Sequence, residues 1–335
     1  MRKFIQTIQN IWKIEDLRSR LGVTFLFVLI YRFGSFVVLP GIDPTALTAL
    51  QAQTAGGLMA LLDMFSGGAF SNASVFALGI MPYISASIVI QLLTIAVPYF
   101  QKMQKEGESG RQKMNQITRY LTVAILLFQG PSYLVNLSVQ MAQAGQAVAV
   151  GFNWFTISST ILLCAGSMFV MWLGERITDR GIGNGISFII LIGIIARFPA
   201  AIIQEFSSRL NEGGGLMVFI LEIILLLAVF AFAILLVQGT RRIPVQYAKR
   251  MVGNKQYGGV RQYIPLKVNS ANVMPIIFAQ AIMFIPIALA GFSTSESASA
   301  FTRAFMNNDG ILYNTVFAIL IIVFTYFYTA IIINP

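Results

Sequence analysis

The chain has 335 residues, of which 56% are hydrophobic, 11% are charged and none is histidine. Soluble domains carry roughly 25% charged residues, and the mean hydropathy of +0.74 also excludes an ordinary soluble globular protein. The absence of histidine removes the commonest metal ligand and the usual acid–base group at neutral pH. The single cysteine, Cys164, cannot form an internal disulfide.

The N-terminal residues 1–20 have the pattern of an amphipathic helix. Phe4, Ile8, Ile11 and Trp12 recur at helical spacing among basic residues. This pattern is typical of a helix that lies on a membrane surface. A frayed basic tail is the alternative. No small-residue cleavage site follows the first apolar run, so we expect no cleavable signal peptide.

Long apolar stretches follow at regular intervals. A membrane-spanning helix needs ~20 mostly apolar residues. Eight stretches qualify, at about residues 21–39, 74–97, 117–137, 154–173, 185–204, 216–238, 271–291 and 311–333. The sequence therefore predicts an all-α polytopic membrane protein.

Basic residues indicate how these spans are oriented. With the N-terminus inside, nineteen of the 23 Lys and Arg residues fall in the inner segments 1–20, 98–119, 174–184 and 239–270. Only Arg197, Arg209 and Arg303 fall in outer loops. Because short basic loops stay on the cytoplasmic side, we expect a cytoplasmic N-terminus.

Arg32 and Glu222 are the candidates for functional charges inside predicted spans. Both are away from the span centres, which favours snorkelling or helix pairing over a proton relay.

Five motifs give the chain a family resemblance. They are FSGGAFSNASVFALGIMPYISASIVIQLL (65–93), KEGESGRQK (105–113), WLGERITDRGIGNGIS (172–187), RRIPVQYAKR (241–250) and IPLKVNSANVMPIIFA (264–279). In this order they resemble the SecY family of bacterial Sec channel subunits, through essentially the whole chain. The resemblance implies an inverted-repeat helix bundle with a central pore.

The same resemblance implies how the chain is divided. Residues 21–205 would form the first half with spans one to five, and 206–335 the second half with spans six to eight and the cytoplasmic loop 239–270. The family has ten spans, whereas this sequence ends after the eighth. We therefore expect an incomplete second half and a C-terminally truncated form.

Isoleucines on two spans are candidates for the pore lining. Ile80 and Ile84 share one helical face, as do Ile186 and Ile190. By periodicity alone such side chains face lipid or packed neighbours. The resemblance instead implies a pore constriction of Ile80, Ile84, Ile186, Ile190 and Ile277. A ring of branched apolar side chains stops ions by dewetting, yet it moves aside for a polypeptide.

The segment 58–72 is too short to span the membrane. Leu58–Phe65 fits two helical turns, and the glycines that follow free the backbone to hinge. An outer amphipathic loop is one interpretation. The resemblance implies a plug containing Leu58, Leu61, Leu62, Met64, Phe65, Gly67 and Gly68.

The resemblance also implies a lateral gate, formed by spans two and three facing spans seven and eight. The resemblance places Ser85, Ser87, Gln91, Asn272 and Gln280 there. Hydrogen bonds across such a gate are worth only about 1 kcal/mol each in membranes, so a signal sequence could displace them. Alternatively, these side chains satisfy the backbone of bent helices.

The loop 239–270 carries seven basic residues and no acidic one. It is a topology anchor at least, but it is longer than a connection needs. The resemblance implies that Arg241, Arg242, Lys249 and Arg250 dock the SecA motor or the ribosome.

The resemblance implies that the chain is the central channel subunit of the Sec translocon in the cytoplasmic (inner) membrane of a bacterium. It would pass unfolded secretory proteins across and release transmembrane segments sideways. The expected partners are SecE, SecG, SecA, the ribosome, signal sequences, unfolded polypeptides and membrane lipids. We expect no enzyme, cofactor or metal site. A small-solute or ion transporter and an intramembrane protease are the alternatives, and the protease would need paired Asp or a Ser–His pair within spans.

Overall fold

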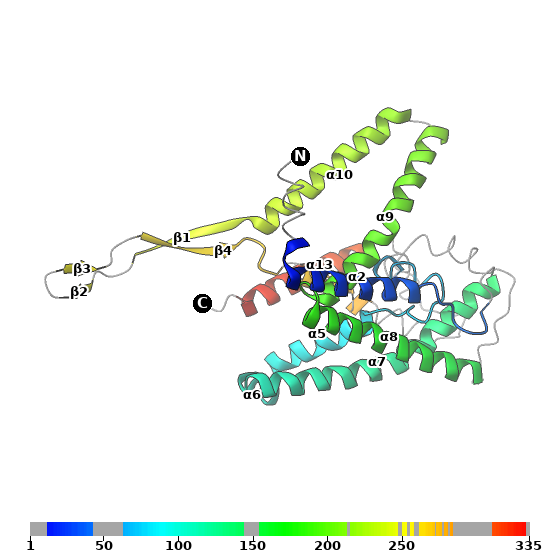
Figure 1. Ribbon diagram of the computed structural model, residues 1–335, viewed down its shortest axis with the longest axis horizontal. Helices are drawn as coiled ribbons and strands as arrows, with labels where there is room; N and C mark the ends of the chain where they lie inside the picture. The colour runs from blue at the N-terminus through cyan, green and yellow to red at the C-terminus, as the bar shows by residue number, and fades with distance from the viewer. Residues whose placement is uncertain are drawn as a thin grey trace. The chain divides into compact units, whose positions relative to one another are not determined.

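The structure is a computed structural model (Figure 1). It describes residues 12–42, 63–143, 154–212, 215–246, 250–252, 255–257, 261–271, 273–276, 278–280, 282–283 and 310–332. The chain forms two compact units, residues Met1–Ala200 with Gln280–Phe317 and residues Ala201–Ala279 with Ala318–Pro335. The predicted division into halves at 205/206 is based on the family's internal repeat, whereas these units are defined by compactness. The division into halves therefore stays a prediction.

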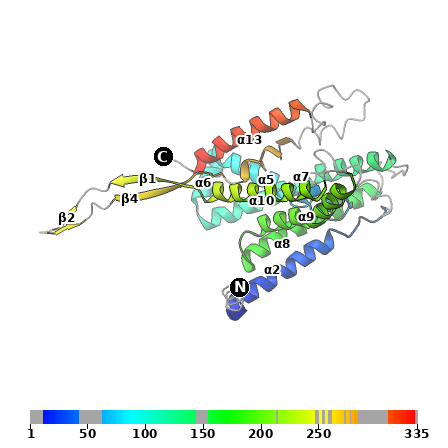
Figure 2. The same ribbon diagram turned by 90° about the horizontal axis from the view of Figure 1, so that it is seen from above.

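Helices build most of the first unit. They are α2 (Glu15–Gly34), α5 (Met81–Ala96), α6 (Pro98–Lys105), α7 (Glu108–Gln143), α8 (Trp154–Arg180) and the first part of α9 (Gly185–Glu212). Helix α7 packs against both α5 and α8, and α2 runs beside α8 (Figure 2). The predicted surface helix over 1–20 lies largely outside the described residues, although Trp12 and Lys13 are helical.

Helix α5 starts later than the sequence predicts. Pro82 occupies its first turn, where a missing N–H costs nothing. Residues 75–80 before it form turns, and both Ala73 and Gly79 have positive φ. The prediction of a helix from residue 74 is therefore wrong. At the other end Val97 is extended before Pro98, as expected of a residue that precedes proline.

Four described helices are long and apolar enough to cross a membrane. They are Trp154–Arg180, Gly185–Leu210, Gly215–Gln238 and Ile311–Ala330. A further span is possible if Met81–Thr94 and Pro98–Lys105, bent by 98°, count as one. Predicted spans four, five, six and eight are confirmed as helices, the last two as α10 (Gly215–Gln238) and α13 (Ile311–Ile332). Helices α2 and α7 cover most of spans one and three, and the seventh span is described only in short pieces.

The core of the first unit forms around an irregular segment, residues 63–80. Phe70, Ala73, Ala77 and Leu78 of this segment are buried. They share one hydrophobic cluster with Leu39, Ile42, Leu126, Tyr133, Leu134, Leu137 and Leu163. The helices therefore enclose a non-helical piece of chain.

One glycine of α8 allows this enclosure. A Cβ on Gly166 would lie 2.1 Å from the carbonyl oxygen of Val75. Side-chain atoms never approach a backbone oxygen that closely, so only glycine lets α8 reach the segment.

The loop 239–270 contains a β-ribbon rather than irregular chain. Strands β1 (Thr240–Gln246) and β4 (Arg261–Lys267) pair antiparallel, and β2 (Arg250–Val252) pairs with β3 (Lys255–Tyr257) further out (Figure 1). In the inner pair Arg242 faces Pro265 and Pro244 faces Tyr263. Within the part of the chain that the structure describes, this two-stranded ribbon has no third strand to cover either face.

We expect Gly166→Ala to destabilise the protein by about 1–3 kcal/mol, because the added methyl overpacks the contact with Val75. Thermal unfolding in detergent, followed by loss of helical signal, measures this. Gly22→Ala is the matched control, since nothing lies within 4 Å of a Cβ there. That change should be neutral or stabilising by up to about 1 kcal/mol. Equal melting temperatures for the two variants would contradict the packing argument.

Candidate functional site

The irregular segment 63–80 is the most constrained part of the first unit. Residues 63–65 make one helical turn, and turns follow. Gly67 and Gly68 have φ values of 67° and 90°, which side chains disfavour. The segment also bonds to itself: the Ser66 hydroxyl donates to the Asp63 carbonyl over 3.1 Å and accepts from the Phe70 N–H over 3.0 Å.

Two side chains of helix α2 donate hydrogen bonds to backbone carbonyl oxygens of this segment. The Tyr31 hydroxyl donates to the carbonyl of Ser66 over 3.2 Å. Arg32 Nη1 donates to the carbonyl of Gly67 over 2.5 Å. The same guanidinium lies 4.8 Å from the centre of the Phe36 ring. Arg32, predicted to snorkel or pair helices, instead satisfies the backbone of a buried turn.

Helix α9 approaches the segment backbone to backbone. A Cβ on Gly193 would lie 2.5 Å from the carbonyl oxygen of Phe65, and one on Gly67 would lie 3.1 Å from the Cα of Gly193. One turn further, Arg197 forms an ion pair with Asp63. The Asp63 side chain is only 1% exposed, whereas that of Arg197 is 45% exposed.

The Asp63 carboxylate joins two elements. Its Oδ1 accepts the Ser71 N–H over 2.8 Å. Arg197 Nη2 lies in ion-pair contact with Oδ2 while it donates to the Ser71 hydroxyl over 2.9 Å. Loss of Arg197 would leave the buried Asp63 charge uncompensated, whereas loss of Asp63 would leave a half-exposed arginine that water can still solvate.

Helix α7 completes the enclosure. The Tyr133 hydroxyl donates to the carbonyl of Phe70 over 2.8 Å, and the two rings meet edge to face with centres 4.8 Å apart. Three helices thus bind carbonyl or carboxylate groups of residues 63–71. We call residues 63–71, with these contacts, the clamped segment.

The predicted plug residues fall partly within the clamped segment. Met64 and Phe65 are half-buried, and the positive φ angles of Gly67 and Gly68 agree with the backbone freedom expected of them. Leu58, Leu61 and Leu62 lie outside the described residues. Their role, like that of the whole plug, stays a prediction.

Four of the five predicted constriction residues are described, and they lie at the start of α5 and on α9. Ile80 and Ile84 are buried at the start of α5, and the Ile84 N–H donates to the Ile80 carbonyl over 3.1 Å. Ile186 and Ile190 are half-buried on α9. A Cβ on Gly174 of α8 would lie 3.1 Å from Ile186 Cγ1, so these two residues are neighbours. Ile277 lies outside the described residues.

The predicted gate residues are partly described. Ser85, Ser87 and Gln91 are half-buried on α5. The side-chain oxygen of Gln280 is buried and accepts no hydrogen bond within the described part of the chain. Asn272 lies outside the described residues, so the pairing across a gate stays a prediction.

Three of the four predicted docking residues lie on the β-ribbon. Arg241 and Arg242 are exposed on β1. Because successive strand residues point to opposite faces, these two side chains lie on different faces of the ribbon. Arg250 begins β2, and Lys249 lies outside the described residues.

Two arginines assigned to outer loops lie within a helix instead. Arg197 and Arg209 both belong to α9, which continues through Pro199 to Glu212. The loop assignment is therefore wrong. Glu222 of α10 receives a bond of 2.6 Å from Arg209, which also bonds Glu205 over 2.8 Å. The interpretation of Glu222 as a helix-pairing residue is confirmed.

Sequence reasoning missed Asp63, Arg197 and Gly193 as site residues. Asp63 and Arg197 are single charges inside the apolar runs LLDMF and GIIARFP. An unpaired charge in such a run signals a hidden partner. Gly193 gave no such signal, because a glycine in an apolar helix has many uses.

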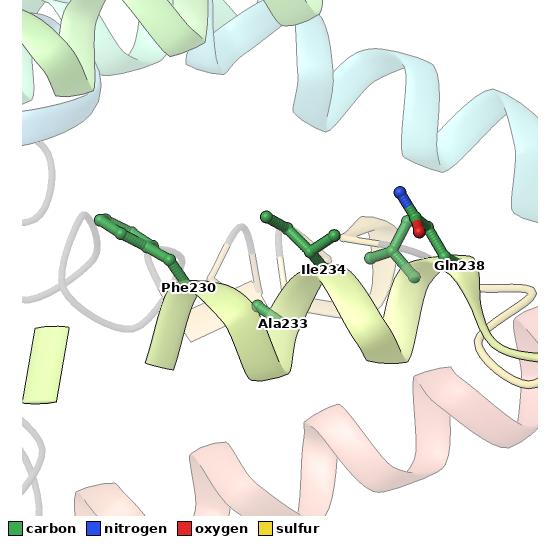
Figure 3. A pocket seen from close by; sticks show the side chains of 5 residues that line it. Phe230, Ala233, Ile234 and Gln238 are labelled. Carbon is green, nitrogen blue, oxygen red and sulfur yellow. The ribbon is translucent and has the colours of Figure 1, made fainter. Parts of the chain in front are cut away.

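An apolar hollow of about 550 Å³ lies beside α10, lined by Phe230, Ala233, Ile234, Val237 and Gln238 (Figure 3). Its walls carry one polar side chain and no ionisable group. Within the described residues, no group of His, Cys, Asp and Glu side chains is placed to hold a metal ion. The hollow therefore offers an apolar surface without groups for acid–base chemistry.

Comparison with protein families identifies a family for this chain. The family model described as SecY matches residues 74–335. "Protein translocase subunit SecY" of Rickettsia conorii is 42% identical over 323 residues, 96% of this chain and 74% of that protein. The protein of the same name from Escherichia coli K12 is 42% identical over 325 residues, 96% of this chain and 73% of that one.

Solved structures are similar in fold. "The structure of a protein conducting channel" has a TM-score of 0.58 at 16% identity and covers 93% of this chain and 70% of that one. "Sec61 in the Canine ribosome-channel complex from the endoplasmic reticulum" has a TM-score of 0.56 at 16% identity and covers 91% and 69%. The all-α polytopic membrane fold is thereby confirmed, with the β-ribbon as an addition.

Proposed function

The chain belongs to the SecY family, and on this premise we propose how its residues form and control a protein-conducting channel. It is the channel subunit of the Sec translocon, which passes unfolded secretory proteins across the membrane and releases transmembrane segments sideways. The observation that carries this function is the similarity to SecY subunits over nearly the whole chain. Such a subunit is a channel rather than a catalyst, so we propose that energy comes from its partners.

We assign the constriction to Ile80, Ile84, Ile186, Ile190 and Ile277. The burial of the α5 pair at a helix start and the half-burial of the α9 pair support this assignment. Branched apolar side chains bind neither ions nor any particular polypeptide. A ring of them suits a pore that must close to ions and open to many sequences.

Replacing Ile84 and Ile190 with Asn should raise the resting ion conductance of the reconstituted channel, because the polar groups allow water to enter. A barrier lowered by about 1.4 kcal/mol corresponds to a tenfold leak. Electrical recording in planar bilayers measures this. Ile161→Asn on α8 is the control, since that side chain is 60% exposed. An unchanged leak in the constriction variants would return these residues to a packing role.

We propose that the clamped segment belongs to a plug over residues 58–72, and that Ser85, Ser87 and Gln91 of α5 face Asn272 and Gln280 in a lateral gate. The many side-chain contacts to residues 63–71 support a separable element that specific bonds keep in place. The buried, unbonded oxygen of Gln280 supports a polar partner for this residue in the gate.

The chain is a membrane protein, and we propose the bacterial cytoplasmic (inner) membrane with the N-terminus in the cytoplasm. The distribution of Lys and Arg along the sequence supports this orientation. The basic β-ribbon would then lie on the cytoplasmic side, where ribosomes and motor ATPases reach it.

Single cysteines test this orientation in a Cys164→Ser background. We expect Ser109→Cys and Gly253→Cys to react with an impermeant maleimide from the cytoplasmic side, and Ser293→Cys from the outside. Intact and inverted vesicles separate the two sides. Labelling of Gly253→Cys from the outside would invert the arrangement.

We propose SecE, SecG, SecA and the ribosome as partners, together with signal sequences, unfolded polypeptides and membrane lipids. The basic residues Arg241, Arg242, Lys249 and Arg250 would dock the motor or the ribosome. The exposure of Arg241 and Arg242 on the ribbon supports this role. An anionic partner such as ribosomal RNA would bind with strong salt dependence.

Charge reversal tests the docking surface. Arg241→Glu with Arg242→Glu should weaken binding to ribosomes or SecA, and binding of the unaltered protein should fall as salt rises. Co-sedimentation with ribosomes and light scattering with SecA measure these effects. Lys102→Glu with Lys105→Glu on α6 is the matched control, because these exposed charges lie outside the ribbon. Equal loss in both double variants would point to net charge rather than to docking.

A further inference from the structure

The strongest feature that the proposed function leaves unused is the ion pair of Asp63 and Arg197. Asp63 lies at the start of the clamped segment, and Arg197 lies on α9, more than a hundred residues later in the chain. The pair therefore joins a short irregular segment to a long apolar helix. Neither partner belongs to the constriction, the gate or the docking surface assigned above.

The pair is strongly asymmetric in exposure. The Asp63 side chain is 1% exposed and that of Arg197 is 45% exposed. A carboxylate removed from water needs a counter-charge or hydrogen bonds to stay ionised. Among the described residues, Asp63 Oδ1 has the Ser71 N–H and Oδ2 has only the charge of Arg197.

Arg197 also contacts other residues of the segment. Its Nη2 donates to the Ser71 hydroxyl over 2.9 Å. Its Nε and Nη2 lie 3.4 and 3.5 Å from the position that a Cβ on Gly68 would occupy. The guanidinium therefore lies directly beside residue 68, within van der Waals reach of a Cβ there. One arginine thus touches the beginning, middle and end of residues 63–71.

The remaining contacts with α9 are not directional. Gly193 lies against Phe65 and Gly67 through backbone atoms alone. Such packing excludes water but provides no specific bond. Among the described residues, the ion pair and the hydrogen bond of Arg197 are therefore the directional contacts between α9 and the segment.

From this geometry we propose that the Asp63–Arg197 pair is an electrostatic latch that positions the clamped segment and sets how often the channel opens at rest. This inference rests on the proposed plug role of the segment. When the segment leaves α9, Asp63 loses its counter-charge and must be hydrated. Because Arg197 is half-exposed, water or an entering polypeptide can compete for its guanidinium and release the latch.

The test uses Asp63→Asn, Arg197→Gln and the double variant, each in the full protein in proteoliposomes. We expect either single variant to raise the resting ion conductance about tenfold or more, since one charge is left without its partner. The conductance opened by a signal peptide should stay unchanged. The double variant should leak less than the sum of the single effects predicts, because the two changes are coupled. Arg197→Lys should restore part of the closure.

The matched control is Arg209→Gln. Arg209 is another ion-paired arginine of α9, but its partners are Glu205 and Glu222. Its loss should leave the resting conductance unchanged. A leak equal to that of Arg197→Gln would mean that any weakening of α9 opens the pore, and this would overturn the latch.

A second measurement reports the segment without relying on conduction. Met64→Cys in a Cys164→Ser background should react slowly with a small maleimide, and faster when Asp63→Asn or Arg197→Gln is added. Unchanged alkylation rates would overturn the latch even if conductance changed. If signal peptides failed to open the unaltered protein, the channel assignment would fall, while the alkylation rates would still decide whether the pair seats the segment.

Discussion

The first unit depends on how a non-helical segment is satisfied inside an apolar bundle. Lipid and packed side chains offer no hydrogen bonds, so irregular backbone survives there only if protein or trapped water satisfies it. Tyr31, Arg32 and Tyr133 each donate to a carbonyl of the clamped segment. Asp63 accepts one of its N–H groups. The helices can enclose this segment because their polar side chains lie opposite its backbone carbonyl groups.

Hydropathy predicted the helices well, because a membrane requires long apolar runs with internally bonded backbone. Helices α8, α9, α10 and α13 lie where the sequence predicted spans. Hydropathy failed at residues 75–80, which are as apolar as a helix but form turns. Composition does not distinguish buried turns from a buried helix, since both avoid water. The positive φ angles of Ala73 and Gly79 are incompatible with a continuous right-handed helix at these positions. Of the two residues, only Gly79 could have indicated a turn from the sequence.

The site was predictable only where the residue type alone indicates a property, such as the backbone freedom of glycine. Gly67 and Gly68 were predicted to have unusual backbone freedom, and they have positive φ. Arg197 was misplaced because it was counted with an outer loop although it lies within the predicted span 185–204. Its partner lies far away in the chain, and one sequence alone does not reveal such a pairing. The β-ribbon was missed because arginine and proline interrupt the alternation of apolar and polar residues that usually indicates a strand.

The register of that ribbon has a consequence for how the molecule behaves among copies of itself. Arg242 faces Pro265 and Pro244 faces Tyr263, so both prolines occupy the same kind of cross-strand pair. Proline has no N–H to donate, which fits pairs whose backbone groups point outward. Each outer edge of the ribbon therefore lacks one donor midway along its length. A strand from a neighbouring molecule therefore meets an interrupted row of N–H donors at either edge. This disfavours edge-to-edge pairing of ribbons between channel molecules.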